Sequence, residues 1–293
     1  MSRELPVPLA RHLARLLKRT RRRYRRRLAE CQAEFSETSV HELRIETRRA
    51  LALLDLVAAL DLVTSPEKPR RTLKKRLDAF DDLRDTHVQL RRLRPWLKQF
   101  PEAREFANYL RESERGLVAE LRREIRKLKS RRVARLFKAW EQDVAGVRSE
   151  SAATAVEILA QPLGEVFARV SELRRKIQPR NLVTIHRTRI AFKKFRYLCE
   201  LLHALLPGLT PRQLRAMHVW QTRMGDIQDA EVLLNEVERA VKHGKVQLES
   251  VKRLHAALAR RLVVLVNQFL STANQLDRFQ PQKVLRARKR KPS

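Results

Sequence analysis

The chain has few residues of the kinds that interrupt helices or build other scaffolds. Its 293 residues include 6 glycines and 12 prolines, and aromatic residues make up 5%. Leu, Ala, Arg, Lys and Glu dominate, a composition that favours helix over strand. Hydrophobic residues at 43% exclude an intrinsically disordered chain. No stretch shows sustained alternation of apolar and polar residues, so the sequence predicts an all-α fold.

Cysteines and long apolar runs are equally scarce. Cys31 and Cys199 both lie in helical patterns, with neither a disulfide framework nor a metal-ligand spacing around them. This favours a reducing compartment, and we expect a cytoplasmic protein. No stretch approaches the roughly 18 apolar residues of a transmembrane helix, and the N-terminal segment lacks the apolar run of a signal peptide. We therefore expect no membrane span, no metal and no cofactor.

Acidic residues are too few to balance the basic ones. The chain has 65 Lys and Arg against 33 Asp and Glu, a formal net charge of +32 at pH 7. A compact domain with this charge repels itself unless anions screen it. We therefore expect a polyanionic partner: nucleic acid, an anionic membrane or a polyphosphate. Charge alone does not choose among them.

Apolar periodicity, caps and breakers predict a series of helices. Ser36 or Ser39 can cap one of them, and Thr210 with Pro211 in the first turn starts another, which Gly225 is expected to break. The other expected ranges are 9–34, 68–97 with a bend near 81–85, 101–129, 130–146, 154–178, 183–206 and 246–276. Residues 147–153 form the best internal boundary, and 281–293 read as a basic, disordered tail.

Two segments, 40–56 and 185–201, repeat one pattern of residues. Aligned on His41 and His186, each has a cation three residues later and two more seven and eight residues later. A second pair of segments, 77–90 and 221–234, matches at nearly the same offset, with Asp82 meeting Asp226. The sequence therefore predicts a duplication, with repeats at about 8–146 and 154–280. We expect two similar antiparallel helical bundles related by an approximate two-fold axis.

Each repeated segment forms a cationic stripe on a helix. Because an α-helix turns about 100° per residue, His41, Arg44 and Arg48 fall on one side and the apolar residues on the other. Like charges at this spacing repel by a few tenths of a kcal/mol per pair, so keeping them twice indicates a multivalent anion between the stripes. Arginine, lysine and histidine all suit phosphate oxygens. In the second copy the same side carries His186, Arg189, Lys193 and Arg196.

Three residues in the second pair of repeated segments, 77–90 and 221–234, are further candidates. Asp85 and Asp229 could orient a histidine or arginine of the site through a hydrogen bond, or they could cap helix starts. Arg84, beside Asp85, is a further candidate for binding phosphate.

On these residues the chain resembles the CHAD domain family (the conserved histidine α-helical domain). The strings VHELRIETRR, IHRTRIAFKKFRYLCELL, LRDTHVQL and MGDIQDAEVLL carry the resemblance, which spans about residues 8–280 as a single domain. It implies two pseudo-symmetric bundles around a basic groove or pore, and non-catalytic binding of inorganic polyphosphate at polyphosphate granules. The binding role falls on His41, Arg44, Arg48, Arg49, His186, Arg189, Lys193, Lys194 and Arg196.

The two copies depart from each other at two positions. Leu51 stands where the second copy has Arg196, and Asp81 stands where it has Gly225. We therefore expect the C-terminal half to contribute more to binding.

Two other functions stay open from the sequence. Non-specific nucleic-acid binding could use the basic run 11–27 and the C-terminal tail, although no DNA- or RNA-binding signature is present. An enzyme acting on phosphates usually has a Gly-rich phosphate loop or carboxylates that hold Mg²⁺. The chain has no Walker-type loop, and Asp81, Asp82 and Asp85 suit helix caps as well as a metal. We expect no enzyme.

Overall fold

The computed structural model describes residues 5–63, 66–147 and 153–285, and within them the fold is all-α, as predicted. The only β-type pairing in these ranges is an isolated bridge between Gln178 and Asn181. The longer helices are α1 (Val7–Ala33), α2 (Glu37–Ala59), α3 (Glu67–Asp78), α4 (Asp81–Leu93), α6 (Arg104–Lys127), α7 (Ser130–Ala145), α8 (Ala155–Arg175), α9 (Leu182–Leu202), α10 (Pro211–Lys242) and α11 (Leu248–Leu270). Short helices complete the chain: α5 (Trp96–Gln99), η1 (Pro101–Ala103), η2 (His203–Leu205), η3 (Ala273–Phe279) and α12 (Pro281–Leu285).

Side-chain caps fix the starts of several helices. The backbone N–H of Ser39 donates to Ser36 Oγ at 3.2 Å, so Ser36 is the residue that caps α2. Thr210 caps α10 with Pro211 in the first turn, as predicted, and Gln213 returns a bond to the Thr210 N–H. Such caps satisfy backbone groups that a helix leaves unpaired, and each stabilises by about 1 kcal/mol.

The structure differs from the sequence expectations at three places. The expected long helix with a bend is two helices, α3 and α4, separated at residues 79–80. The predicted break at Gly225 is wrong, since α10 runs through this residue without interruption. The expected tail begins with the helix α12, in which Val284 is buried and accepts a hydrogen bond from the Gly208 N–H at 3.0 Å. The remainder of the tail, 286–293, lies outside the described residues.

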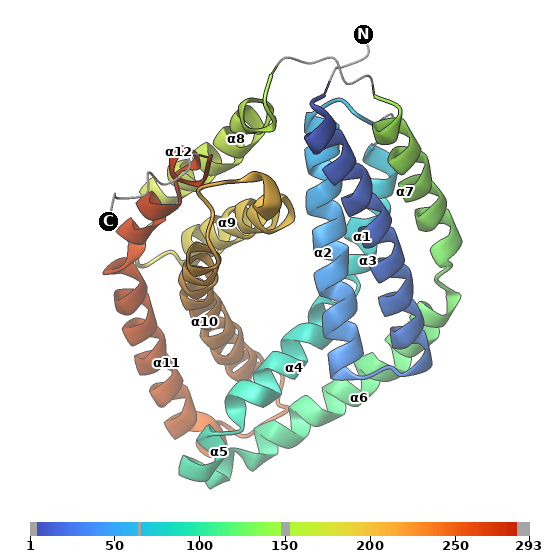
Figure 1. Ribbon diagram of the computed structural model, residues 1–293. Helices are drawn as coiled ribbons and strands as arrows, with labels where there is room; N and C mark the ends of the chain where they lie inside the picture. Colours follow the sequence, from blue (N-terminus) through green and yellow to red (C-terminus); the bar gives the residue numbers. More distant parts are fainter. Residues whose placement is uncertain (1–4, 64–65, 148–152, 286–293) are drawn as a thin grey trace.

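The helices form a ring in which equivalent elements of the two repeats meet. In Figure 1, α2, α4, α9 and α10 surround the centre, while α1, α6, α7, α8 and α11 lie outside them. α2 packs against α9, and α4 packs against α10. These pairs carry the repeated segments, so the arrangement fits the expected two-fold relation between the repeats.

Two apolar clusters hold the ring together. The larger one includes the T-shaped pair of Phe192 and Trp220, whose ring centroids are 4.5 Å apart. The smaller one joins α4, η1 and α6 to α10 and α11, and it buries Phe106 and Leu110 with Leu233. Burying a side chain of this size contributes about 1.5–3 kcal/mol. The repeats are therefore not independent bundles, because each completes the core of the other.

Candidate anion-binding site

The packing of α2 against α9 brings the two cationic stripes together. Burial, and then the nearby charges of Arg48 and Arg189, lower the pKa of Lys193 to about 6. Burial, and then Arg44, lower the pKa of Arg48 to about 10. Charges that perturb one another in this way lie close together in a partly desolvated space. We call Arg44, Arg48, Arg189 and Lys193 the central cationic cluster.

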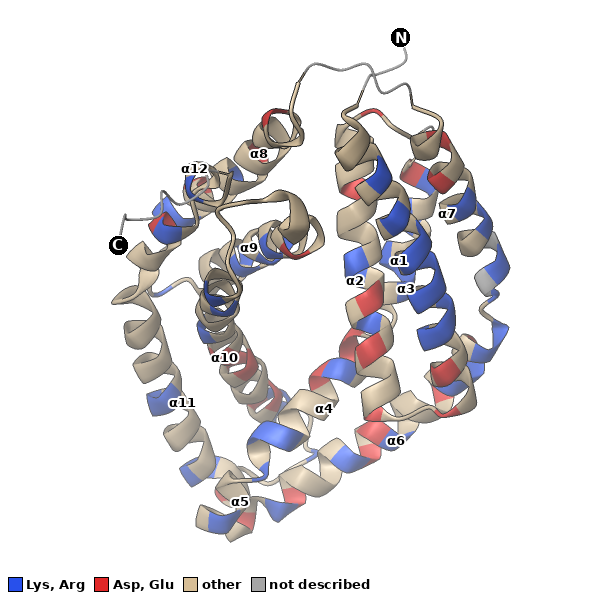
Figure 2. Cartoon of the chain, in the orientation of Figure 1, with Lys and Arg blue, Asp and Glu red and all other residues tan. Residues whose placement is uncertain are grey.

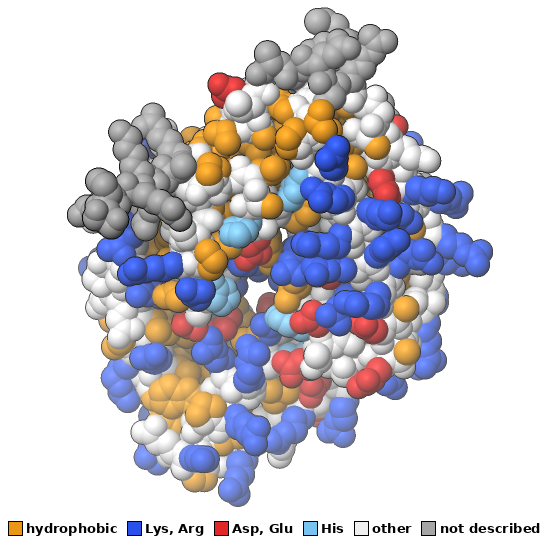
Figure 3. Space-filling model, viewed as in Figure 1, with side chains coloured by type: hydrophobic (Ala, Val, Ile, Leu, Met, Phe, Trp, Pro, Cys, Tyr) orange, Lys and Arg blue, Asp and Glu red, His pale blue; other side chains and the backbone are white. Residues whose placement is uncertain are grey.

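The cluster belongs to the helices that border a central hollow. Figure 3 shows this face hollowed at its middle, with histidine, basic and acidic side chains gathered around the hollow. In the same orientation, Figure 2 shows basic residues on the segments of α2, α4, α9 and α10 that surround it. The side chains of Arg48, Arg189 and Lys193 keep partial access to solvent. An anion entering the hollow can therefore reach cations from both repeats.

The two histidines have equivalent neighbours in the two repeats. His186 Nδ1 donates to the amide oxygen of Gln228 on α10. Arg84 on α4 occupies the position equivalent to Gln228 and lies near His41. Partial desolvation and, for His41, the charge of Arg84 lower the pKa of both rings. The cations of the site therefore lie close enough to both rings to disfavour their protonation.

The equivalent arginines Arg44 and Arg189 have opposite environments. Arg44 has a side chain that is 2% exposed, and it donates to the Leu77 carbonyl at 2.6 Å and to Asp81 at 2.5 Å. Arg189 lies against Gly225, where a Cβ atom would come 3.5 Å from its Nε. Within the described ranges Arg189 has no carboxylate partner, and its buried Nε has no hydrogen-bond acceptor. Asp81 neutralises the charge of Arg44. Gly225 offers Arg189 no carboxylate, so Arg189 can bind an anion.

Three other predicted site residues are paired with acids. Arg49 donates to Glu46 at 2.7 Å, and Lys194 pairs with Asp55 at 2.8 Å. Arg196 is buried, where it pairs with Glu200, donates to Gln221 at 2.8 Å and lies 4.8 Å from the Tyr197 ring centroid. These pairings reduce the charge that each cation can offer to a ligand.

Arg84 joins the cations that stay without an acidic partner. Burial, and then Arg91, lower its pKa, and its buried Nη1 has no hydrogen-bond partner among the described groups. The site thus offers four basic side chains that form no ion pair with any carboxylate in the described ranges: Arg48, Arg84, Arg189 and Lys193.

Asp226 and Asp229 connect the two repeats, and neither Asp85 nor Asp229 caps a helix. Asp229 lies in the middle of α10 and accepts from Arg92 of α4 at 2.9 Å, and Arg92 also bonds Asp226. Asp85 lies more than one turn into α4, so it is not a cap either. Alignment of the repeats could not identify Arg92, because Glu236 stands at the equivalent position of the other repeat. Arg92 fastens α4 to α10 beside the hollow.

Neither a metal site nor a membrane-spanning segment is found in the described part of the chain. No three or more His, Cys, Asp or Glu side chains there are grouped as metal ligands, and no helix there has the length and hydropathy to cross a bilayer.

Comparisons with known proteins identify relatives of this fold. The model of the CHAD domain family matches residues 37–238. The crystal structure of the CHAD domain from the plant Ricinus communis is similar over 99% of this chain and 97% of that chain, with a TM-score of 0.68 and 17% sequence identity. At that identity the likeness shows a shared fold. A comparison with curated proteins finds no match.

Proposed function

The chain belongs to the CHAD domain family, and from this premise and the central cationic cluster we propose that it binds inorganic polyphosphate without catalysing its turnover. The ligand lies in the hollow between the repeats and contacts α2, α4 and α9. Binding holds the protein on cytoplasmic polyphosphate granules.

The observation that carries the proposal is a group of partly buried cations without acidic partners. Burial, and then repulsion from Arg48 and Arg189, lower the pKa of Lys193 to about 6, so the empty site disfavours this concentration of positive charge. A chain of phosphates replaces that repulsion with charge-assisted hydrogen bonds, which are about twice as strong as neutral ones. The repulsion in the empty site therefore becomes attraction in the complex.

The surroundings of the cluster favour a polyanion without bases. Phe192, Phe195 and Trp220 are fully buried in the core, and Tyr197 is also buried. Recognition of single-stranded nucleic acid uses exposed aromatic rings on which bases stack. The α9 stripe offers none, and its cations suit a ligand made of phosphate alone.

The placement of the carboxylates supports binding without catalysis. Asp81 pairs with Arg44, while Asp226 and Asp229 pair with Arg92. Phosphoryl transfer uses carboxylates that hold Mg²⁺ ions against the phosphates. Here Asp81, Asp226 and Asp229 are engaged by arginines instead.

The test replaces Arg48, Arg189 and Lys193 together by Gln and measures polyphosphate affinity at several salt concentrations. Several charge-assisted contacts of about 1.5–3 kcal/mol each are lost, so we expect binding to weaken at least about 100-fold. The thermal midpoint should not fall, because the mutual repulsion is removed. The matched control is a triple Gln variant of exposed cations that have no ion pair among the described residues: Lys242, Arg260 and Arg261.

The control should stay within about threefold of the wild type, because its cations are exposed and screened by salt. Equal losses in both variants would show that diffuse charge, not the cluster, binds the ligand. Release of phosphate from polyphosphate by the pure protein would contradict the non-catalytic part of the proposal.

A further inference from the structure

Apart from the central hollow, the outer face of the N-terminal repeat carries a second concentration of cations. We propose that the outward face of α1 and α7 is a separate docking surface for the phosphate backbone of duplex nucleic acid. The surface does not depend on the proposed polyphosphate site, and the two can be tested apart.

The outward face of α1 carries a straight row of cations. Its members follow one another at intervals of four, three, four and three residues, the spacing of one helix face. They occupy an arc of about 80° and extend about 21 Å along the axis. The opposite side of α1 is fixed in the core by Leu13, Leu17 and Leu28. The exposed row consists of Arg11, Arg15, Lys18, Arg22 and Arg25.

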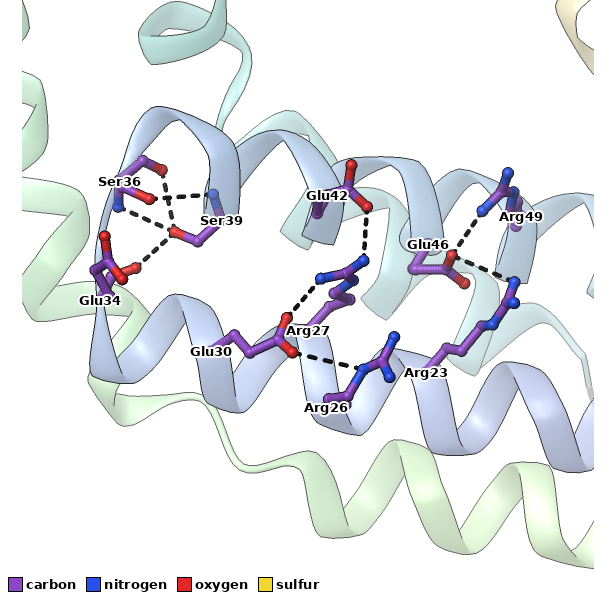
Figure 4. Close-up of polar contacts among 10 residues, drawn as sticks. All are labelled: Arg23, Arg26, Arg27, Glu30, Glu34, Ser36, Ser39, Glu42, Glu46 and Arg49. Carbon is purple, nitrogen blue, oxygen red and sulfur yellow. Dashed lines mark hydrogen bonds and ion pairs between the residues drawn. The ribbon is translucent and has the colours of Figure 1, made fainter.

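Acidic residues neutralise the inward arginines of α1 but not this row. Arg21 pairs with Glu141 of α7 at 3.1 Å, and Arg27 pairs with Glu30 and with Glu42 of α2. Figure 4 shows the contacts of Arg27 with Glu30 and Glu42, together with neighbouring contacts along the seam between α1 and α2. The row itself forms no ion pair with any carboxylate in the described ranges. Its charges therefore repel one another without contributing to the packing of the helix.

Helix α7 adds a second row beside the first. α7 packs along α1 and runs antiparallel to it (Figure 1). Its exposed cations Arg131, Arg135 and Lys138 follow the same helical spacing and form no ion pair with described acids. Packed helix axes lie about 8–10 Å apart, so two cationic ridges run side by side. Figure 3 shows Lys and Arg side chains crowded over this part of the face.

The chemistry of the face selects its partner. On this face the exposed large hydrophobic residue is Val7, which lies at the start of α1. The other exposed large hydrophobic residues in the described ranges lie on α9, α10 and α11. Insertion into a membrane needs an exposed apolar helix face, and single-stranded nucleic acid needs aromatic rings. Cations alone suit the phosphates of a duplex, which carries one charge per about 1.7 Å of its axis. The core holds the row of cations on α1 rigid and straight. Binding of a stiff duplex therefore costs little conformational entropy.

The experiment compares two ligands on the wild type and three variants. Binding of a 20-base-pair DNA duplex and of inorganic polyphosphate is measured by fluorescence anisotropy over a range of salt. The first variant replaces Arg15, Lys18, Arg22 and Arg25 by Gln, and the second is the central triple Gln variant. The control replaces four exposed cations of the other repeat by Gln: Arg215, Lys242, Arg260 and Arg261.

We expect the α1 variant to bind DNA about 30-fold more weakly, with a salt slope reduced by about 0.9 for each lost phosphate contact. Its polyphosphate affinity should change less than about threefold, whereas the central variant should lose polyphosphate and keep DNA. Equal loss of DNA binding in the α1 variant and the control overturns the proposal, as does an equal loss of both ligands in the α1 variant. Failure of the central variant to lose polyphosphate overturns only the polyphosphate proposal.

Discussion

The contrast between Arg44 and Arg189 predicts the effect of one substitution at Gly225. The change Gly225→Asp gives the second repeat the carboxylate that Asp81 gives the first. A Cβ at this position lies 3.5 Å from Arg189 Nε and 3.6 Å from Nη2, an ordinary contact, so the new carboxylate reaches the guanidinium without displacing the backbone. Arg189 then forms an ion pair within the protein and no longer binds phosphate freely.

The size of the effect follows from the bond that is lost. A hydrogen bond between charged groups contributes about 1.5–3 kcal/mol, which corresponds to a loss of about 10- to 100-fold in polyphosphate affinity. Isothermal titration calorimetry with polyphosphate measures this directly. Gly225→Asn is the matched control, since it has the same shape without the charge and should weaken binding less than about threefold. Equal losses in the two variants would refute the reasoning.

Gly225→Ala separates stability from binding, because it adds the Cβ alone. Replacing glycine inside a helix should stabilise the protein by about 1 kcal/mol, measured by denaturant unfolding. Its affinity for polyphosphate should not change. A loss of stability would show that the close approach of Arg189 requires a glycine.

Three further predictions concern the same helices. Arg44→Ala should lower the free energy of unfolding by about 1–3 kcal/mol, because it removes a buried side chain together with its bonds to the Leu77 carbonyl and Asp81. Arg189→Ala should change the free energy of unfolding by less than about 1 kcal/mol and mainly weaken binding, and urea denaturation compares the two variants. Polyphosphate binding near pH 7.5 should take up close to one proton, because Lys193, with a pKa near 6, is neutral in the empty site and charged in the complex. Calorimetry in buffers of different ionisation enthalpy measures the uptake, and Lys193→Arg should remove most of it; an unchanged uptake would contradict this assignment. Arg92→Ala should lower stability by about 1 kcal/mol or less, since its side chain is 43% exposed and its bridges are partly screened.

The same lysine makes stability depend on pH in a stated direction. Because the folded-state pKa of Lys193 lies below its ordinary value, the unfolded state binds more protons between about pH 6 and 10. The contribution of this group to stability therefore rises with pH across that window and is lost as pH falls toward 6.

Composition, apolar periodicity and capping residues allowed the all-α fold and most helix starts to be predicted from sequence. Capping by Thr210 is a local interaction between neighbouring residues, so a sequence contains the information for it. The continuity of α10 through Gly225 could not be predicted in this way. A glycine usually weakens a helix, but here tertiary packing against Arg189 decides its role.

The site residues illustrate the same limit. The alignment of the repeats made Arg48 and Lys193 equivalent candidate binding residues. The structure brings their side chains close together. Composition could not show that Lys194 pairs with Asp55, or that Arg196 pairs with Glu200, because these contacts depend on how helices pack and on which rotamer each side chain adopts. The difference between Asp81 and Gly225 was visible in the sequence, but its effect on Arg44 and Arg189 required coordinates.

The apolar cluster shared by the repeats has a consequence for synthesis of the protein. α4 and α6 leave the ribosome well before α10 and α11, which are the helices that cover their apolar side chains. Until then Phe106 and Leu110 stay accessible to other chains, and the contacts that bury them close a long loop at an entropic cost. We therefore expect the N-terminal half to expose apolar surface until the C-terminal helices are made. Expressed alone, it should aggregate or exchange helices with a second copy.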